Sequence, residues 1–225
     1  MNDETPTSAS EELYSLPVIL TRPDELSPAL VVKRAMDLVF ATVCLVLVAP
    51  LFALVAAVIK LDSEGPVFYR AVRVGKNGRQ FVFYKFRTMV DNAHVLKKHL
   101  QHLNEREGPF FKIAEDPRIT RVGKWLRRFS IDELPQLWNV LIGDMSMVGP
   151  RPPDVDEIHH YRPQDFHGLD VLPGVTGLWQ VSERLNPSFN TKMALDRKYI
   201  ENWNLWLDCK ILLKTIPVVL RANGQ

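Results

Sequence analysis

The chain has 225 residues, of which 46% are apolar, and a formal net charge of +2. This length suffices for one domain with its own core. Its two cysteines are too few for a disulfide framework and do not have the spacing of zinc ligands. Residues 1–30 carry six acids and one base, a charge of −5, which leaves +7 for residues 31–225. A basic body favours anionic partners such as phosphorylated substrates or anionic lipid.

Residues 1–30 are polar, acidic and interrupted by four prolines, which predicts a disordered tail. The start of the chain does not read as a signal peptide, because no basic stretch followed by an apolar one is found there.

The segment Leu38–Ile59 contains 22 residues without a charge. As a helix it would be about 33 Å long, enough to cross the core of a bilayer. Pro50 near its middle predicts a kink or a break. A single spanning helix and a re-entrant helix with both ends on one face both remain open, and a buried core helix is the least favoured interpretation. Basic residues at both ends (Lys33, Arg34 and Lys60) favour the re-entrant form, since cytoplasmic flanks carry the excess of Lys and Arg.

Two strands are predicted over Val67–Val74 and Gln80–Arg87, joined by Gly75-Lys76-Asn77-Gly78. Asn-Gly between two alternating runs is a strong signal for a hairpin. Lys85 and Arg87 fall on the same face of the second strand, because side chains alternate along a strand.

Helical patterns follow over residues 91–107, 122–129, 154–161 and 188–202. Trp203 and Trp206 precede an apolar segment, 211–220, which predicts a last, amphipathic helix at the membrane interface.

Two adjacent carboxylates, Asp132 and Glu133, stand at the predicted start of an amphipathic helix that runs to about Ile142. Ser130 with Glu133 fits a capping box. Asp132 as the N-cap accommodates Pro135 better, since Pro135 then falls where no backbone donor is needed. Both arrangements place the carboxylates at the positive end of the helix dipole, so helix capping is the favoured interpretation of these residues taken alone.

A set of basic residues favours a role in phosphate chemistry over helix capping for these carboxylates. They are Lys85 and Arg87, Arg127 and Arg128, and Arg151 between two prolines. Each taken singly is more often a surface charge. Together they can neutralise a diphosphate, with arginine giving bidentate contacts. A carboxylate beside such cations stays ionised and can attack phosphorus, and a neighbouring glutamate can help to hold Mg²⁺.

Four stretches, in order along the chain, resemble the bacterial sugar transferase family, the monotopic phosphoglycosyl transferases or polyprenyl-phosphate hexose-1-phosphate transferases. They are Lys85–Met89, Ser130–Asn139, Gly143–Pro152 and Pro173–Val181. The resemblance extends from about Val32 to Gly224 and is strongest to small exopolysaccharide-initiating enzymes of the galactosyl- or glucosyl-phosphate transferase type.

The resemblance implies a mostly helical α+β fold with a β-hairpin, catalytic helices and interfacial amphipathic helices. It implies three parts: a tail (1–30), a membrane re-entrant helix broken at Pro50 (31–60), and a catalytic domain (61–225) on the cytoplasmic face of the bacterial inner membrane.

The resemblance also implies a reaction. Asp132 would attack the sugar-bearing phosphorus of a UDP-sugar, expel UMP and pass the phosphosugar to undecaprenyl phosphate. Glu133 would assist with Mg²⁺, which the two carboxylates would hold together. Lys85, Arg127, Arg151 and Arg184 match basic residues of the family that handle phosphates or nucleotide, and Arg87 joins them as a substrate-binding candidate from its strand face.

Two positions depart from the family pattern. Leu172 stands where the family has arginine before Pro-Gly. Ser182-Glu183-Arg184 replaces the usual Ser-Gly-Arg. Both departures lie on the side expected to bind the nucleotide.

Two other functions remain open. A metal-dependent glycosyltransferase would move only the sugar and release UDP, but Asp154-Val155-Asp156, which fits a DxD motif, follows a proline turn and heads a helix. A non-catalytic, membrane-anchored scaffold would bind anionic lipid with its basic face. Nucleic acid is not an expected partner, because few aromatic residues are interleaved with the basic ones. The sequence names neither the sugar nor the acceptor's chain length, and leaves open whether the chain forms a homo-oligomer.

Overall fold

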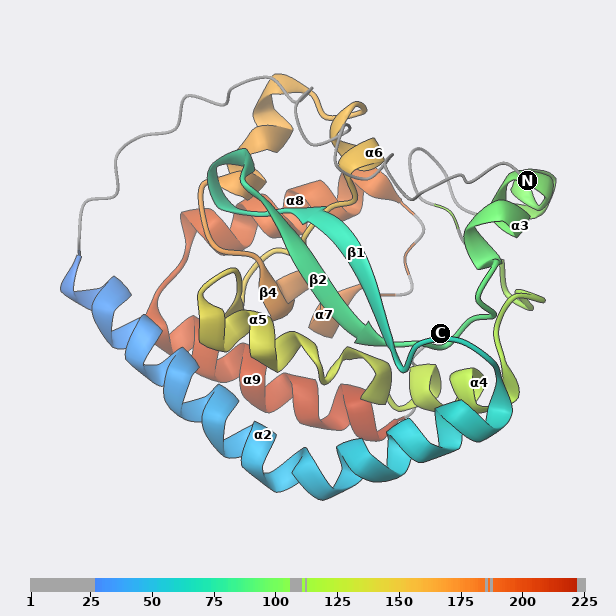
Figure 1. Ribbon diagram of the computed structural model, residues 1–225. Coiled ribbons are helices and arrows are strands. Elements are labelled where there is room, and N and C mark those ends of the chain that lie inside the picture. Colours follow the sequence, from blue (N-terminus) through green and yellow to red (C-terminus); the bar gives the residue numbers. More distant parts are fainter. Residues whose placement is uncertain (1–26, 106–110, 112, 185, 187, 222–225) are drawn as a thin grey trace.

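The computed structural model describes residues 27–105, 111, 113–184, 186 and 188–221. The predicted tail, apart from its last four residues, lies outside this range, as do the last two residues of the helix predicted over 91–107. The mostly helical α+β fold is confirmed: helices surround a two-stranded hairpin and a second, very short two-stranded sheet (Figure 1).

Helix α2 (Pro28–Asp62) is the longest element, with 35 residues. It begins at Pro28, whose fixed φ suits a first helical turn and whose missing N–H costs nothing there. The helix bends in its middle, where blue passes into cyan in Figure 1, yet it stays helical through Pro50. The expected break at Pro50 is therefore absent and a kink takes its place. A proline removes one backbone hydrogen bond, and a helix can absorb that loss by bending without unwinding.

Helix α2 exposes much of its apolar surface. Val39, Val46, Leu47 and Leu54 are each more than 60% exposed. Among the described residues α2 is the one helix long and apolar enough to cross a membrane. Helix α9 (Leu205–Leu220) lies inside the bend of α2 (Figure 1). It adds exposed apolar side chains, among them Trp206, Leu213 and Leu220. Apolar surface on this scale is typical of a membrane-associated protein.

Strands β1 (Phe68–Val74) and β2 (Gln80–Phe86) form the predicted antiparallel hairpin. Asn77 and Gly78 adopt positive φ in its loop, the conformation that the Asn-Gly pair favours. Phe81 and Phe83 of β2 are buried against α5 (Gln136–Ile142). The hairpin therefore supports the helix that follows the two adjacent carboxylates.

A second sheet, which the sequence did not predict, pairs β3 (Ser146–Val148) with β4 (Gly174–Thr176) in parallel. A Cβ on Gly174 would lie 2.0 Å from the backbone nitrogen of Gly149, so the two segments can approach this closely only without a side chain. The pairing brings the third and fourth of the family-like stretches side by side.

Helices α4 (Arg121–Arg128) and α8 (Phe189–Glu201) agree with the ranges predicted over 122–129 and 188–202. Helix α3 (Ala93–His99) covers less than half of the helix predicted over 91–107, and α6 (Val155–Ile158) lies within the range predicted over 154–161. Helix α7 (Leu178–Ser182) was not predicted. Short 3₁₀ turns cover Lys76–Gly78, Gln101–Leu103, Ile131–Glu133 and Pro163–Leu169. Helix α6 is shorter than the helix predicted over 154–161.

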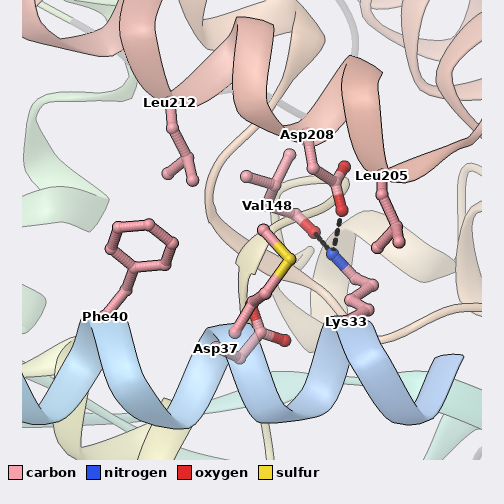
Figure 2. Close-up of a pocket in the computed structure, with 8 residues that line it drawn as sticks. Lys33, Asp37, Phe40, Val148, Leu205, Asp208 and Leu212 are labelled. Atoms are coloured by element: carbon pink, nitrogen blue, oxygen red, sulfur yellow. Dashed lines mark hydrogen bonds and ion pairs between the residues drawn. The ribbon is translucent and has the colours of Figure 1, made fainter. Parts of the chain in front are cut away.

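The first turns of α2 are fixed to the body by a polar cluster, here called the Lys33 cluster, made of Lys33, Asp37, Tyr199, Trp203 and Asp208. Lys33 Nζ lies 2.6 Å from Asp208 Oδ2 and donates to the carbonyl oxygen of Val148 at 3.0 Å. Figure 2 shows Lys33 of α2 pointing to Asp208 of α9, beside a small cavity. Tyr199 Oη and Trp203 Nε1 also donate to the Asp208 carboxylate, at 2.8 and 3.1 Å.

Candidate active site

The two adjacent carboxylates do not cap a helix. Ser130 takes a left-handed conformation (φ 55°) and its side chain accepts no capping bond. A 3₁₀ turn over Ile131–Glu133 follows, and α5 begins only at Gln136. The capping interpretation is wrong because backbone carbonyls take up the amide donors here: Glu133 N donates to Ser130 O, and Leu134 N to Ile131 O, both at 3.2 Å. Both carboxylates are thereby left for other partners.

The ammonium group of Lys85 is one such partner. Lys85 Nζ lies 2.8 Å from Glu133 Oε1 and 3.8 Å from Asp132 Oδ2. Asn139 sets this geometry by fixing α5 to β2: its Nδ2 donates to Val82 O at 2.6 Å, and its Oδ1 accepts from Tyr84 N at 3.2 Å. The strand that carries Lys85 is thus bonded to the helix that follows the carboxylates.

The two carboxyl groups have pKa values displaced in opposite directions. Burial would raise the pKa of Glu133, but Lys85, Arg184 and Arg151 outweigh it and lower that pKa to about 2. Burial raises the pKa of Asp132 and the charge of Glu133 raises it further, while Lys85 opposes the shift. Asp132 is only 6% exposed, and its carboxylate accepts no hydrogen bond from the residues that the structure describes. Asp132 is therefore the less stabilised, more reactive anion of the pair.

Three arginines surround this pair. Arg127 Nε donates to Thr88 Oγ1 at 2.8 Å, and Arg184 donates through Nη1 to Ser130 Oγ at 3.1 Å. Burial lowers the pKa of Arg127, with Asp132 as the main opposing charge. Burial would also lower the pKa of Arg151, but Glu157 and then Glu133 raise it above its ordinary value. Each guanidinium therefore interacts electrostatically with Asp132 or Glu133.

Two predicted basic residues lie elsewhere: Arg128 is exposed, with its guanidinium over the ring of Phe129, and Arg87 faces the end of α2. The guanidinium of Arg87 donates to the carbonyl oxygens of Ser63, at 2.8 Å, and of Glu64. These contacts fix the loop after α2, and Arg87 itself is only 5% exposed. The strand-face argument grouped Arg87 with Lys85, but alternation along a strand does not show which partners a long side chain will find.

Three further residues belong to the site, and none was predicted as a site residue, since Ser130 was considered only as a helix cap. Thr88 and Ser130 hold Arg127 and Arg184, and Glu157, only 6% exposed, is the main opposing charge for Arg151. Thr88 and Ser130 stand inside the family-like stretches, which is a usable signal. Glu157 carries no such signal, because its closeness to Arg151 depends on the turn through Pro152 and Pro153.

The described residues contain no cluster of three or more His, Cys, Asp or Glu side chains suited to hold a metal. Two carboxylates are nevertheless what Mg²⁺ commonly takes from a protein when substrate phosphates supply other ligands. Asp132 and Glu133 fit that pattern if the ion pair between Lys85 and Glu133 Oε1 opens to make that oxygen available.

Asp132, which is buried, and Glu133, which is half-buried, lie among cations in a protein with a long exposed apolar helix, an arrangement suited to a membrane-associated protein that binds phosphorylated groups. The chain belongs to the bacterial sugar transferase family, whose sequence model matches residues 28–222. The resemblance predicted from four short stretches is thereby confirmed.

Similar proteins include galactosyl transferase CpsE of Streptococcus agalactiae serotype III, 45% identical over 196 residues, and exopolysaccharide production protein ExoY of Rhizobium meliloti, 42% identical over 197 residues. The undecaprenyl-phosphate galactose phosphotransferase of Salmonella typhimurium is 44% identical over 196 residues. These alignments cover 87%, 86% and 85% of the chain. The chain spans 87% of ExoY but only 43% of CpsE and 41% of the Salmonella protein.

Proposed function

We propose that the protein transfers a sugar-1-phosphate, a hexose such as glucose or galactose, from a UDP-sugar to undecaprenyl phosphate and so begins the assembly of an exopolysaccharide. Support comes from family membership and from the name of the Salmonella relative, an undecaprenyl-phosphate galactose phosphotransferase. UMP is the leaving product.

The observation that carries the proposal is the state of Asp132. Its carboxylate is buried, accepts no hydrogen bond within the described part of the chain, and lies 3.8 Å from a lysine ammonium. A carboxylate of this kind keeps little of its water and gains no donor from the described residues. It is therefore a stronger nucleophile than a solvated one, and the cations around it favour a phosphate as the electrophile.

The reaction then runs in two displacements. An oxygen of Asp132 bonds to the sugar-bearing phosphorus as the bond from that phosphorus to the UMP oxygen breaks, and UMP leaves with the electron pair. An oxygen of undecaprenyl phosphate next attacks the aspartyl phosphosugar, which frees Asp132 and forms the lipid-linked sugar diphosphate. Both displacements bring anions together, so neutralising their charge is the main task of the site.

The basic residues divide this task. Lys85 lies nearest the carboxylates and serves the sugar-bearing phosphate, while Arg127, Arg151 and Arg184 serve the rest of the diphosphate and the incoming lipid phosphate. Glu133 and Asp132 would hold Mg²⁺, which would further neutralise the diphosphate.

The membrane is the place of the reaction, since the acceptor is a lipid. Exposed apolar side chains of α2 and α9 suit burial in one leaflet, and the bend of α2 suits a re-entrant helix that returns to the cytoplasmic face. Cysteine labelling from either side of the membrane would test this topology: a label introduced near residue 27 and one in the body should react from the same side. Opposite sides would establish a spanning helix.

Incubation of the purified protein with UDP-sugars tests the reaction. We expect UMP release when undecaprenyl phosphate is present. Without acceptor, the intact mass should rise by one phosphohexose, and Asp132→Asn should abolish this rise. Release of UDP instead of UMP would identify a glycosyltransferase that moves only the sugar, and no turnover with any UDP-sugar would leave a lipid-binding scaffold.

A further inference from the structure

The side chain of Gln136, the first residue of α5, is a buried amide whose nitrogen has no acceptor among the described residues. It is only 2% exposed, and its Nε2 finds no acceptor in the part of the chain that the structure describes. A buried donor without an acceptor costs folding free energy, so native proteins retain few of them. Such a group calls for an explanation beyond packing.

Asn139, one turn further along the same helix, shows that an amide in this place can be satisfied. It is also fully buried, yet both ends of its amide bond to the backbone of β2, at 2.6 and 3.2 Å. One amide of α5 therefore fixes the fold. The other leaves its donor without an acceptor in the free protein.

The position of Gln136 ties it to the carboxylate pair. It follows Glu133 by three residues and Asp132 by four, and Leu134 and Pro135 between them are both in right-handed helical conformation. The backbone bonds here join residues three apart, as in a 3₁₀ helix, so residues three apart share one face. The Gln136 side chain thus lies on the face of Glu133, the carboxylate next to the one proposed as the nucleophile.

We propose that Gln136 is a substrate-binding residue whose Nε2 donates a hydrogen bond to a non-bridging oxygen of the sugar-bearing phosphate while Asp132 attacks it. This inference rests on the proposed function. A phosphoryl oxygen accepts hydrogen bonds without donating any, which is what an unpartnered N–H requires. Negative charge on these oxygens is best held in the transition state by donors already in place.

The replacement Gln136→Met tests this, because methionine has nearly the same shape and no donor. In the absence of substrate the variant should melt at a higher temperature than the wild type, since a buried unpaired polar group is removed. Its kcat/KM for UMP release should fall roughly 10- to 100-fold, with most of the loss in kcat. If Gln136 only packed in the core, its replacement would not raise the melting temperature and lower kcat/KM together.

Asn139→Leu is the matched control, an amide-to-aliphatic change on the same helix. It should lower the melting temperature, because Val82 O and Tyr84 N lose their partners. A fall in the melting temperature of Gln136→Met would show that its amide is bonded in the free protein and would overturn the proposal. Unchanged turnover in Gln136→Met would overturn it equally.

Inorganic phosphate separates this proposal from the proposed function. Phosphate should raise the melting temperature of the wild type and raise that of Gln136→Met less. An equal rise in both proteins overturns the role of Gln136, whatever reaction is catalysed. If phosphate stabilises the wild type more than the variant while no UDP-sugar yields UMP, that result overturns the proposed reaction and supports the contact between Gln136 and phosphate. A wild type that shows neither effect overturns both.

Discussion

Lys33 and Lys85 each lie beside carboxylates, but the carboxylates of the two clusters differ in their hydrogen bonds. In the Lys33 cluster, Lys33 bonds Asp208 and a carbonyl, while Tyr199 and Trp203 complete the hydrogen bonds of Asp208 (Figure 2). In the candidate active site, Lys85 bonds Glu133, but Asp132 beside it accepts no hydrogen bond from the described residues.

The two clusters differ in whether the hydrogen bonds of a buried carboxylate are complete. A buried charge whose hydrogen bonds are complete joins two elements, here α2 and α9, and offers nothing to a substrate. A buried charge whose hydrogen bonds are incomplete is costly in the free protein and gains its partners only from a ligand. The four predictions below test this contrast, in order from the largest expected effect.

Asp132→Asn should reduce UMP release at least about 10³-fold, because the nucleophile is lost. The same change should keep or raise the melting temperature, since it removes a buried charge that lacks hydrogen bonds. Thermal unfolding and an assay of nucleotide release on one preparation measure both effects. A large loss of stability would show that Asp132 is structural, like Asp208.

Asp208→Leu should act in the opposite way. It leaves Lys33, 14% exposed, without its counter-charge, so the free energy of unfolding should fall by about 3 kcal/mol or more. UMP release per folded molecule should change little, as the cluster holds no predicted substrate contact. Adding Lys33→Met should restore part of the stability. Loss of turnover in a fully folded Asp208→Leu protein would contradict this division.

Lys85→Met should lower kcat/KM about 10²-fold, since the cation nearest the reacting phosphate is removed. The pKa of Glu133 should rise from about 2 toward its ordinary value of 4.5. Because the folded-state pKa of Glu133 is depressed, its contribution to stability is present above pH 4.5 and lost as pH falls to about 2. Denaturant titrations between these pH values should show a weaker pH dependence in the variant.

The rate of adduct formation should fall on the acid side as Asp132 becomes protonated, with an apparent pKa above the ordinary 3.8. Glu133→Gln removes a negative charge that raises this pKa, so the acid limb should move to lower pH. Lys85→Met removes a positive charge that lowers it, so the limb should move to higher pH. Shifts in the same direction would contradict the assignment of Asp132 as the titrating nucleophile.

Elements governed by nearby residues could be predicted from the sequence. The hairpin follows from alternation around Asn77-Gly78, and the helix that ends at Ile142 follows from apolar spacing. The carboxylate pair and Lys85 were identified as candidates by residue type and by family resemblance.

Features that depend on contacts between distant segments could not be predicted. No local pattern in Ser146–Val148 or Gly174–Thr176 indicates that these three-residue strands pair. Arg87 shares a strand face with Lys85 in the sequence pattern, yet it is taken up by two carbonyl oxygens at the end of α2. The partners of Arg87 come from more than 20 residues away, beyond what periodicity describes.

The sequence by itself determined the family, the long apolar helix and the pair Asp132-Glu133. Only the tertiary structure decided which groups surround that pair. Ser130 in a left-handed conformation and the 3₁₀ turn after it satisfy the backbone donors with carbonyl oxygens, so the carboxylates are released from capping. Asn139 then bonds α5 to β2 and places Lys85 against them. A capping pattern and a nucleophile use the same residue types, and only the contacts distinguish them.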